Sequence, residues 1–513
     1  MLDVPNEVVF RGHVERETRI RETREGVEDL IKWVTGDATT QPLHRFDVEL
    51  HRRVMAFALA LVALWLAYRV PVSIASTFRT KQGWYLHSGE WRGRHVMSRF
   101  GSAWWIRPIY KLQHGEGPPT LSPVDGDIGL AAGGMSLTVH LLAANMVARM
   151  SYQEAKEVTE AFGDYAPSTR SMQGIAEKLG PAAARHMADL TAPDDDGEII
   201  VVEGDAKGVP HVAPQEHASR TKPHQKQPGG PMSRGERKKR RRLLRKGRAR
   251  KKVGDKSKNA RMFTAFAVYT LKQHPEGSVE GPINRRVFAT FDGPRKAAKL
   301  ALADAKKRGY GTKETLFLAD GAPHLWQIWR RSFAKARPVL DWYHASEYLW
   351  SSGTALHGAK SAELRPWVTA RLEELMRGDV NAVIDALVAA RKTLAEAPKK
   401  RRKKLKKAIR YVRNHREMMQ AYGELNDRNL TYGTGVIEGT IKQLGSRLDA
   451  AGMRWCTEGS DAVLPLCCVL LSGEWSAFEE QVRRTHEAVN SPVIPRVTRA
   501  TARTPHKSAR KAG

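Results

Sequence analysis

Three acidic residues that lie far apart in the chain have surroundings that suit a shared metal site. Asp205 follows the β-branched run 198–203, Asp320 directly follows the apolar segment 315–319, and Glu438 follows a glycine-rich entry to a helix. Phosphodiester transfer commonly uses two divalent cations about 3.5 to 4 Å apart. Such hard cations take oxygen ligands. We therefore expect Asp205, Asp320 and Glu438 to be catalytic and to bind the metal.

Each of these residues also has a structural interpretation. Asp205 and Asp320 could be turn residues, because aspartate is common where strands end. Glu438 could complement the dipole at a helix start. Glu203 lies two residues before Asp205, so both side chains would share one face of a strand. Glu203 could replace a ligand or simply lie near the site, and we treat it as an accessory residue.

The elements that would position these carboxylates form an α/β pattern. Apolar periodicity predicts strands at 198–203, 262–271, 286–291, 315–319 and 338–342. Helices are predicted at 294–308, which opens with proline, and at 323–336. Three strands, then helix, strand, helix and strand is the order of an RNase H-like domain with a mixed five-stranded sheet and flanking helices.

The domain boundaries follow from changes in composition. The predicted parts are a mainly helical N-terminal region at 1–190, a first part of the catalytic core at 197–350, an all-helical, highly charged insertion at 351–432, a second part of the core at 433–485 with a helix at 436–449, and a basic disordered tail at 486–513.

The N-terminal region carries two further features. An aromatic, glycine-rich patch at 83–130 could form a few strands, and helices are expected at 136–150, 151–162 and 169–179. The last two helices suggest a helix-turn-helix that binds DNA ends, or simply helices that pack together. The apolar run 54–68 is shorter than the roughly 20 residues of a membrane span. We expect it to be a buried helix.

The charge balance favours a polyanionic partner. Lysine and arginine total 85 against 55 acidic residues, which gives a net charge of +30. Nucleic acid is the expected partner, although an anionic membrane or plain solvation is also consistent with charge. The basic loop 234–261 is the first candidate DNA contact, and Lys399–Lys404 is the second. The side chains that we expect on DNA are Lys207, Arg237, Lys238, Lys239, Arg240, Arg241, Arg242, Arg245, Lys246, Arg248, Lys442, Arg447 and Arg454.

Cysteine content and the N-terminus indicate a reducing compartment. Cys456, Cys467 and Cys468 are too few and too crowded for a disulfide framework or a four-ligand zinc site. The N-terminus lacks the apolar stretch of a signal peptide. We expect a cytoplasmic protein without zinc and without a membrane partner.

Several sequence blocks together resemble a known family. The segments Glu203–Pro210, Leu318–Ala322 and Gly433–Gly439 are similar to bacterial insertion-sequence transposases of the Asp-Asp-Glu type, specifically the ISKra group within the Mutator and hAT-like assemblage. The likeness covers about 122–478. Leu340–Leu349 looks like the Asp-x-x-His motif of that assemblage, and Gly452–Trp455 also matches.

This resemblance implies a function and a set of roles. Asp205, Asp320 and Glu438 would be the catalytic triad, with Asp341 and His344 as accessory residues. The implied cofactor is Mg²⁺, with Mn²⁺ as a substitute, and water or a DNA 3′-hydroxyl would be the nucleophile. The implied partners are double-stranded DNA at terminal inverted repeats and target sites, bound by a homodimer or larger homo-oligomer at the bacterial nucleoid.

The chain departs from the group in two respects, and other functions stay open. Ala206 stands where the group usually has glycine, and the N-terminal half lacks the cysteine-rich zinc module of many relatives. A transposase-derived DNA-binding protein that does not cut is one alternative. An RNase H-like nuclease without strand transfer is another.

Overall fold

The structure is a computed structural model that describes 2–3, 6–69, 73–80, 82–130, 134–163, 165–212, 235 and 260–490 of the 513 residues. Two compact units are present, and each is treated by itself. Unit 1 comprises 1–143, 152–169 and 479–513, and unit 2 comprises 144–151 and 170–478. All predicted DNA contacts from Arg237 to Arg248 lie outside the described residues, as does most of the predicted tail.

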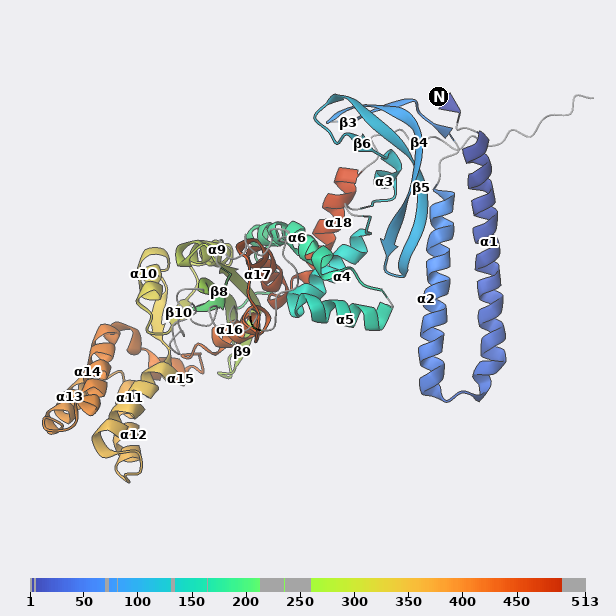
Figure 1. Cartoon of the computed structure of the whole chain (residues 1–513). Coiled ribbons are helices and arrows are strands. Elements are labelled where there is room, and N and C mark those ends of the chain that lie inside the picture. The colour runs from blue at the N-terminus through green and yellow to red at the C-terminus, as the bar shows by residue number, and fades with distance from the viewer. Residues whose placement is uncertain are drawn as a thin grey trace, which may run out of the picture. The chain divides into compact units, whose positions relative to one another are not determined.

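Unit 1 begins with a helical hairpin (Figure 1). Its elements are β1 (Leu2–Asp3), α1 (Asn6–Thr35), η1 (Asp37–Thr40), α2 (Leu43–Tyr68) and β2 (Ser73–Ile74), and β1 pairs with β2. The prediction of a buried helix at 54–68 was wrong about burial. Only 17% of the most apolar window of α2 is buried, because only its last turns pack on a sheet, through Ala63 and Leu66.

Among the described residues, α2 is the one helix long and apolar enough to cross a membrane by length and composition. A single helix of this kind is weak evidence, since helices of soluble proteins also meet the criterion. The finding is compatible with a soluble protein.

The rest of unit 1 is built on an antiparallel sheet with the order β3-β4-β5-β6. These strands are β3 (Thr77–Thr80), β4 (Gly83–Ser98), β5 (Gly101–Gly115) and β6 (Thr120–Leu121), followed by α3 (Pro123–Asp127). Strands therefore do form within the aromatic patch, and they begin slightly before it. Tyr85 and Trp105 are fully buried there.

The three helices predicted after this sheet are present as α4 (Leu137–Arg149), α5 (Tyr152–Gly163) and α6 (Thr169–Asp189). The end predicted for α6 at Leu179 was wrong, since the helix continues through Pro181. Burial of Ala183 and Met187 at helical spacing offsets the hydrogen bond that proline removes. Because α5 and α6 belong to different units, the helix-turn-helix hypothesis stays a prediction.

Unit 2 contains the mixed five-stranded sheet, with the order β11-β10-β7-β8-β9. Its strands are β7 (Ile199–Pro210), β8 (Ala260–Gln273), β9 (Val279–Thr290), β10 (Thr315–Ala319) and β11 (Arg337–Leu340). The first three form an antiparallel meander, and β10 and β11 run parallel to β7. All five predicted strands are present.

One strand boundary changes the picture of the site. We expected Asp205 at the end of its strand, but β7 continues to Pro210 and pairs with β8 along its whole length. The neighbour on the other side, β10, ends at Ala319. Asp205 therefore lies inside β7, at the first position where β7 pairs with β8 and no longer pairs with β10.

Helices cover both faces of this sheet. On one face, Phe317 of β10 contacts Trp326 of α10 (Pro323–Ser332), and α9 (Pro294–Lys307) packs beside it. On the other face, α16 (Gly435–Leu448) lies on β7 and α17 (Thr457–Leu471) on β9. Glu203, Asp205 and Lys207 alternate along β7 with residues of the aromatic face, so they point toward α16.

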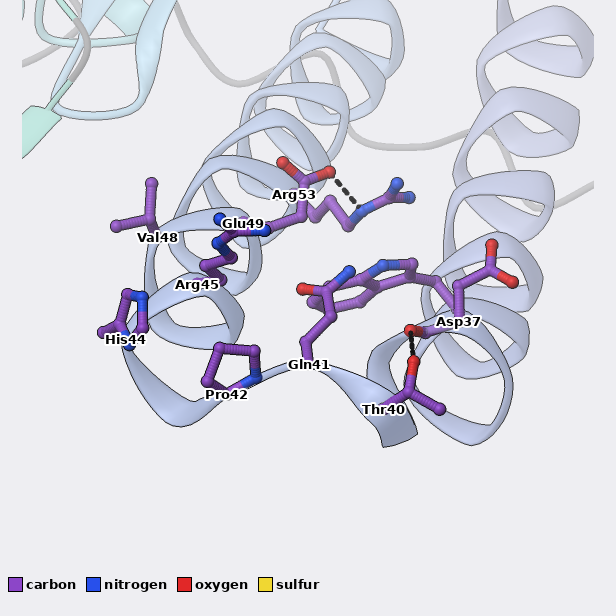
Figure 2. Close-up of a pocket in the computed structure, with 10 residues that line it drawn as sticks. Asp37, Thr40, Gln41, Pro42, His44, Arg45, Val48, Glu49 and Arg53 are labelled. Carbon is purple, nitrogen blue, oxygen red and sulfur yellow. Dashed lines mark hydrogen bonds and ion pairs between the residues drawn. The ribbon is translucent and has the colours of Figure 1, made fainter.

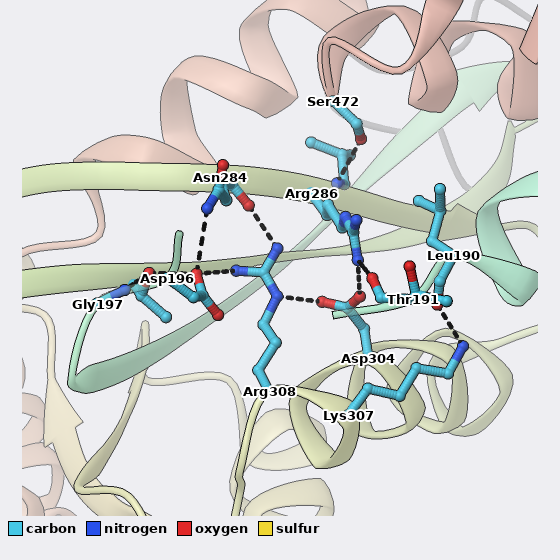
Figure 3. Close-up of polar contacts among 12 residues, drawn as sticks. Leu190, Thr191, Asp196, Gly197, Asn284, Arg286, Asp304, Lys307, Arg308 and Ser472 are labelled. Atoms are coloured by element: carbon cyan, nitrogen blue, oxygen red, sulfur yellow. Dashed lines mark hydrogen bonds and ion pairs between the residues drawn. The ribbon is translucent and has the colours of Figure 1, made fainter. Parts of the chain in front are cut away.

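A buried ion network fixes the end of the sheet where β7 begins (Figure 3). Asp304 of α9 lies 2.7 Å from Arg286 of β9 and 2.9 Å from Arg308. Arg308 also lies 3.5 Å from Asp196, just before β7. Removing one partner of such a pair typically costs about 3 to 5 kcal/mol. The network therefore holds α9, β9 and the entry to β7 together at the end opposite the carboxylates.

The segment between β11 and α16 is mainly helical. It contains α11 (Trp342–His357), α12 (Leu364–Met376), α13 (Val380–Thr393), α14 (Lys399–Asn414), η3 (Arg416–Met419) and α15 (Tyr422–Asp427). Helices α11 to α14 form a group at one end of unit 2 (Figure 1). Leu405, Ala408 and Val412 bury one face of α14, which leaves its lysines and arginines on the other.

Candidate metal centre

Three aspartates lie in one row across the parallel strands of unit 2. The last paired residues are Gly204 with Ala319, and Ala319 with Leu340. Asp205 is the next residue of β7, Asp320 and Asp341 directly follow the ends of β10 and β11, and the Asp341 amide donates to the Ala319 carbonyl at 3.0 Å. Neighbouring strands are about 4.8 Å apart, so the row brings three carboxylates to one edge of the sheet.

The Asp205 carboxylate is half-buried, and one of its two oxygens accepts a hydrogen bond. Its Oδ1 accepts a hydrogen bond from the Ala206 amide at 2.6 Å. Burial raises its pKa to about 6, and the negative charges of Asp320 and Glu438 act in the same direction. Asp320 and Glu438 therefore lie close enough to Asp205 to interact with it electrostatically. Such a group gains from a nearby cation, because a cation favours the charged form.

Glu438 is positioned by the N-terminus of α16. Thr434 precedes this helix, and its hydroxyl donates to Glu438 Oε1 at 3.3 Å. Glu203 is fully buried beneath the helix start, where its Oε2 accepts from the Ile437 amide at 2.7 Å. The Glu203 Oε1 accepts from the Tyr269 hydroxyl at 2.6 Å. Glu203 therefore ties α16 to β7 and fixes Glu438 above the row.

The burial of Glu203 alters its ionisation. Removal from water raises the pKa of this carboxyl to about 7, although the hydrogen bonds from Tyr269 and the Ile437 amide oppose the shift. The charges of Asp341 and Glu438 raise the pKa further. Glu203 is therefore part of the same electrostatic cluster.

Asp341 joins α11, α16 and His344. It caps α11, where its Oδ2 accepts from the His344 amide at 2.8 Å and lies 2.7 Å from His344 Nδ1. Its Oδ1 accepts from the Thr434 amide at 2.8 Å. Burial alone would raise the pKa of Asp341, but these hydrogen bonds outweigh it and lower the pKa.

His344 is the cation of the cluster. The hydrogen bond to Asp341 raises its pKa to about 9, against the effect of burial, and the charges of Asp320 and Glu347 add to the rise. An imidazolium donates from both nitrogens, and it would have to lose its proton to ligate a metal. At neutral pH His344 therefore acts as a positive hydrogen-bond donor beside the row of aspartates.

The hydrogen bonds divide the carboxylates into two kinds. Glu203 and Asp341 use both oxygens on protein donors. Asp205, Asp320 and Glu438 each use one, since Asp320 Oδ1 accepts from the Ala322 amide at 2.9 Å. Among the described residues, no donor meets the second oxygen of these three. The oxygens that remain for a cation thus belong to the predicted triad.

The distances also identify a different set of ligand atoms. One ligand atom each from Asp341, His344 and Glu438 lie within 4.8 Å of one another, and this is the one such group among the described residues. Asp205 and Asp320 lie outside it. The predicted ligands Asp205, Asp320 and Glu438 do not form such a compact group. The all-oxygen donor set fits Mg²⁺.

The described candidates for DNA binding differ in exposure. Lys442 and Arg454 are exposed, and Lys207 is partly exposed, with its ammonium 3.6 Å from Asp449. Arg447 is only 3% exposed, donates to the Val147 carbonyl and lies over the Trp455 ring. The predicted DNA contact of Arg447 was therefore wrong, because its guanidinium is buried and contacts other residues of the protein.

Sequence reasoning missed two residues of the site. Thr434 precedes α16 and contacts both Asp341 and Glu438. Tyr411 of α14 lies against Gly321, the residue after Asp320. In the sequence, the glycine after Asp320 is the one sign that another group packs closely against this position. The glycine does not indicate that the group is Tyr411.

A separate hollow of about 800 Å³ lies at the tip of the α1–α2 hairpin (Figure 2). Its lining includes Trp33, Glu49 and Arg53. Glu49 is paired with Arg52 at 2.6 Å and with Arg53 at 2.7 Å, and hydrogen bonding to Arg52 lowers its pKa to about 2. A carboxylate held in this way is a poor acid or base, so the hollow does not compete as a catalytic site.

Comparison with known proteins adds one match. Residues 246–484 match the model of an uncharacterised protein family, UPF0236. The UPF0236 match covers just under half of the chain and contains Asp320, Asp341, His344 and Glu438, while Asp205 precedes it. No curated protein matches the chain.

Proposed function

We propose that this chain is a transposase of the Asp-Asp-Glu type that cuts and joins DNA at the ends of a bacterial insertion sequence. The observation that carries the proposal is that, among the described residues, one carboxylate oxygen of each of Asp205, Asp320 and Glu438 has no donor, with the two aspartates at the end of parallel strands and Glu438 in the first turn of α16. The UPF0236 family is uncharacterised and is commonly found in transposase-like proteins, which agrees with the proposal.

The architecture of unit 2 supports an RNase H-like assignment. Strand β7 is central, with the antiparallel strands β8 and β9 on one side and the parallel strands β10 and β11 on the other. Helices cover both faces, and a helical segment separates Asp320 from Glu438. Topology alone does not determine activity, so the proposal rests on the site and uses the fold as support.

Each residue of the site has a proposed role. Asp205, Asp320 and Glu438 would hold divalent cations, which when bound supply a polarised phosphate and an activated water. Glu203 keeps α16 on β7, and Asp341 orients His344. The imidazolium of His344 would offset negative charge that develops on the phosphate.

The proposed reaction has two balanced steps. In cleavage, a water oxygen attacks phosphorus, the bond to O3′ breaks, and a 3′-hydroxyl and a 5′-phosphate result. In joining, that 3′-hydroxyl attacks a target phosphate, and a target 3′-hydroxyl leaves. The same group of carboxylates would serve both steps. Neither step requires a covalent bond between the protein and the DNA.

The proposed partner is double-stranded DNA, bound by a homodimer or larger assembly in the cytoplasm at the nucleoid. Lys207, Lys442 and Arg454 lie in unit 2 on or beside α16, and α14 carries ten lysines and arginines without an acidic residue. Cations of this density neutralise phosphates and make binding salt-dependent. These surfaces flank the row of aspartates within one unit.

The test is cleavage and joining of DNA that carries the sequences flanking the gene, in Mg²⁺. Asp205→Asn and Asp320→Asn should abolish both reactions, because asparagine keeps the shape and loses the charge. Asp194→Asn, an exposed residue before β7, is the matched control and should stay active. Activity retained in Asp320→Asn contradicts the proposed site.

The same assay separates the alternatives. Specific binding without strand cleavage in Mg²⁺ or Mn²⁺ would identify a DNA-binding protein that does not cut. Cleavage without joining would identify a nuclease. Either outcome replaces the transposase proposal.

A further inference from the structure

Tyr411 brings a hydroxyl from α14 to the row of aspartates. We propose that this hydroxyl donates a hydrogen bond to a non-bridging oxygen of the phosphodiester that the site binds. The inference rests on the proposed function and adds a substrate-contacting residue from the helical segment. It also gives α14 a direct part in positioning the substrate.

The backbone beside Asp320 is shaped to admit the tyrosine ring. A Cβ atom at Gly321 would lie 2.3 Å from Tyr411 Cε2 and 2.8 Å from the hydroxyl oxygen. Real Cβ atoms do not come so close to other atoms. Glycine at 321 is therefore required for the phenol to lie directly against the residue that follows the metal ligand.

The ring is held in place by its neighbours. It stacks on Tyr348 of α11 with ring centroids 3.8 Å apart and an angle of 13°. One turn later, His415 lies 4.5 Å from the Tyr411 ring, and its Nδ1 is 2.8 Å from the Tyr411 carbonyl. Because two aromatic partners fix the ring, the direction of the hydroxyl is fixed as well.

The Tyr411 hydroxyl is buried, and among the described residues it has no hydrogen-bond partner. A buried polar group without a partner costs roughly 1 to 3 kcal/mol. Such a group in a site is explained if a ligand completes its hydrogen bond.

The surroundings determine the direction of that bond. Burial raises the pKa of Tyr411 far above its usual range, and the charges of Tyr348, Asp320 and Asp341 act in the same direction. A phenol has an ordinary pKa of about 10, so at neutral pH it is protonated and is a donor. Its partner must be an acceptor that enters a site lined by carboxylates, and a phosphate oxygen that arrives with cations meets this requirement.

The charge of α14 fits the same ligand. The helix carries cations on its exposed face and Tyr411 on the face that meets the site. Lys407 lies 5.1 Å above the Tyr348 ring, next to the stack. The DNA backbone would then lie along the exposed cations. Because the Tyr411 hydroxyl is buried in this structure, a phosphate reaches it only after α14 shifts on binding.

The experiment compares wild type with Tyr411→Phe on a short labelled duplex taken from the DNA next to the gene, with the cleavage position mapped beforehand. Binding is measured in Ca²⁺, which prevents turnover. A second duplex replaces the scissile phosphate with a methylphosphonate, which removes one non-bridging oxygen. Single-turnover cleavage of the first duplex in Mg²⁺ and the thermal unfolding midpoint are also measured.

The proposal expects Tyr411→Phe to weaken binding or slow cleavage about 10- to 100-fold, the loss of one hydrogen bond to a charged group. In one methylphosphonate isomer the same substitution should have no further effect on binding, since the bond is already absent. The unfolding midpoint should stay equal or rise, because phenylalanine removes an unpaired hydroxyl.

Tyr432→Phe is the matched control. Its hydroxyl donates to Asn426 at 3.2 Å, so its removal should lower the midpoint slightly and leave binding and cleavage unchanged. Additive effects of Tyr411→Phe and the methylphosphonate would overturn the proposal, as would full activity of Tyr411→Phe or a fall in its midpoint that matches its loss of activity.

Failure of the proposed function gives a different result. If Asp320→Asn still cleaves DNA, the metal centre is wrong and the Tyr411 proposal falls with it. If Asp320→Asn is inactive while Tyr411→Phe behaves as wild type, only the role of Tyr411 is refuted.

Discussion

Asp205 and Asp320 occupy neighbouring positions on two parallel strands of unequal length, one residue beyond the last pair formed by Gly204 and Ala319. Strand β7 continues past this point with β8 as its partner, whereas β10 stops. The step between the strands leaves both carboxylates half-buried on one face. Their partial burial and mutual repulsion explain why the pKa of Asp205 is raised to about 6.

Metal affinity should therefore depend on pH in a defined window. Asp205 must lose its proton to bind a cation, so its affinity for Mg²⁺ should fall about tenfold for each pH unit below its pKa of about 6 and level off above it. Calorimetric titration at pH 5, 6 and 7.5 measures this. Asp205→Asn should lose most of the Mg²⁺ response, and Asp194→Asn should retain it. Equal affinity at pH 5 and 7.5 would contradict the assignment.

His344 should make the stability of the metal-free protein depend on alkaline pH. Its pKa is raised from 6.5 to about 9 by Asp341, so the protonated form is favoured by folding. This stabilisation is fully present below pH 6.5 and is lost as the pH rises through about 9. Urea unfolding in EDTA at pH 6 and 9.5 should reveal the loss in wild type.

The His344→Gln variant should lose less stability over the same range. His324→Gln, on α10 in the same unit, is the control and should follow wild type. Parallel curves for His344→Gln and wild type would exclude the ion pair with Asp341 as the cause.

The elements that carry the candidate site could be predicted from the sequence because they are locally encoded. The β-branched run before Asp205 and the apolar segment before Asp320 predict strands whatever the fold, and the glycines before Glu438 indicate a helix start. These local signals pointed to Asp205, Asp320 and Glu438, whose carboxylates each keep one oxygen without a donor among the described residues.

Other features depend on contacts that the local sequence does not encode. Strand β7 continues to Pro210 despite Gly204 and Gly208, because pairing with β8 across the basic loop outweighs poor strand propensity. Arg447 is a basic residue in a stretch that also contains Lys442 and Arg454, and nothing local to it in the sequence indicates that it is buried in the structure. Tyr411 reaches Gly321 only through the packing of α14 on α11.

Glu203→Gln should stabilise the metal-free protein near neutral pH. Folding raises the pKa of this carboxyl from 4.5 to about 7, so wild type loses stability as the pH rises between these values. The penalty is at most about 3 kcal/mol by the usual conversion. Glutamine can accept from the Ile437 amide and donate to Tyr269, so the gain should appear at pH 8 and vanish at pH 4.5 in urea unfolding. Glu203→Ala, which leaves both partners unpaired, should destabilise; stabilisation by alanine as well would contradict the proposed support of α16.

The basic face of α14 should contribute directly to the salt dependence of DNA binding. Each phosphate contact contributes about 0.9 to the slope of log affinity against log salt. Lys403→Gln combined with Lys404→Gln should reduce the slope by roughly 1 to 2, measured by fluorescence anisotropy across a salt series. Lys299→Gln, an exposed lysine on α9 on the other face of the sheet, is the control. An unchanged slope in the double variant would show that DNA does not lie on this face.

Gly321→Ala tests the close approach between Asp320 and α14 without touching a proposed ligand. The new methyl group would lie 2.3 Å from the Tyr411 ring, so the ring or α14 must move. Overpacking of this kind typically costs about 1 to 3 kcal/mol. The displacement should also lower cleavage, because it moves the Tyr411 hydroxyl away from the row of aspartates.

The control for this substitution is Gly174→Ala on α6, where a Cβ atom has nothing within 4 Å. Alanine there should stabilise the helix by up to about 1 kcal/mol. Urea unfolding and single-turnover cleavage on both variants separate the outcomes. If Gly321→Ala cleaves DNA at the wild-type rate, then the position of Tyr411 relative to Asp320 has no bearing on the reaction, and α14 contributes to the site only through its surface charge.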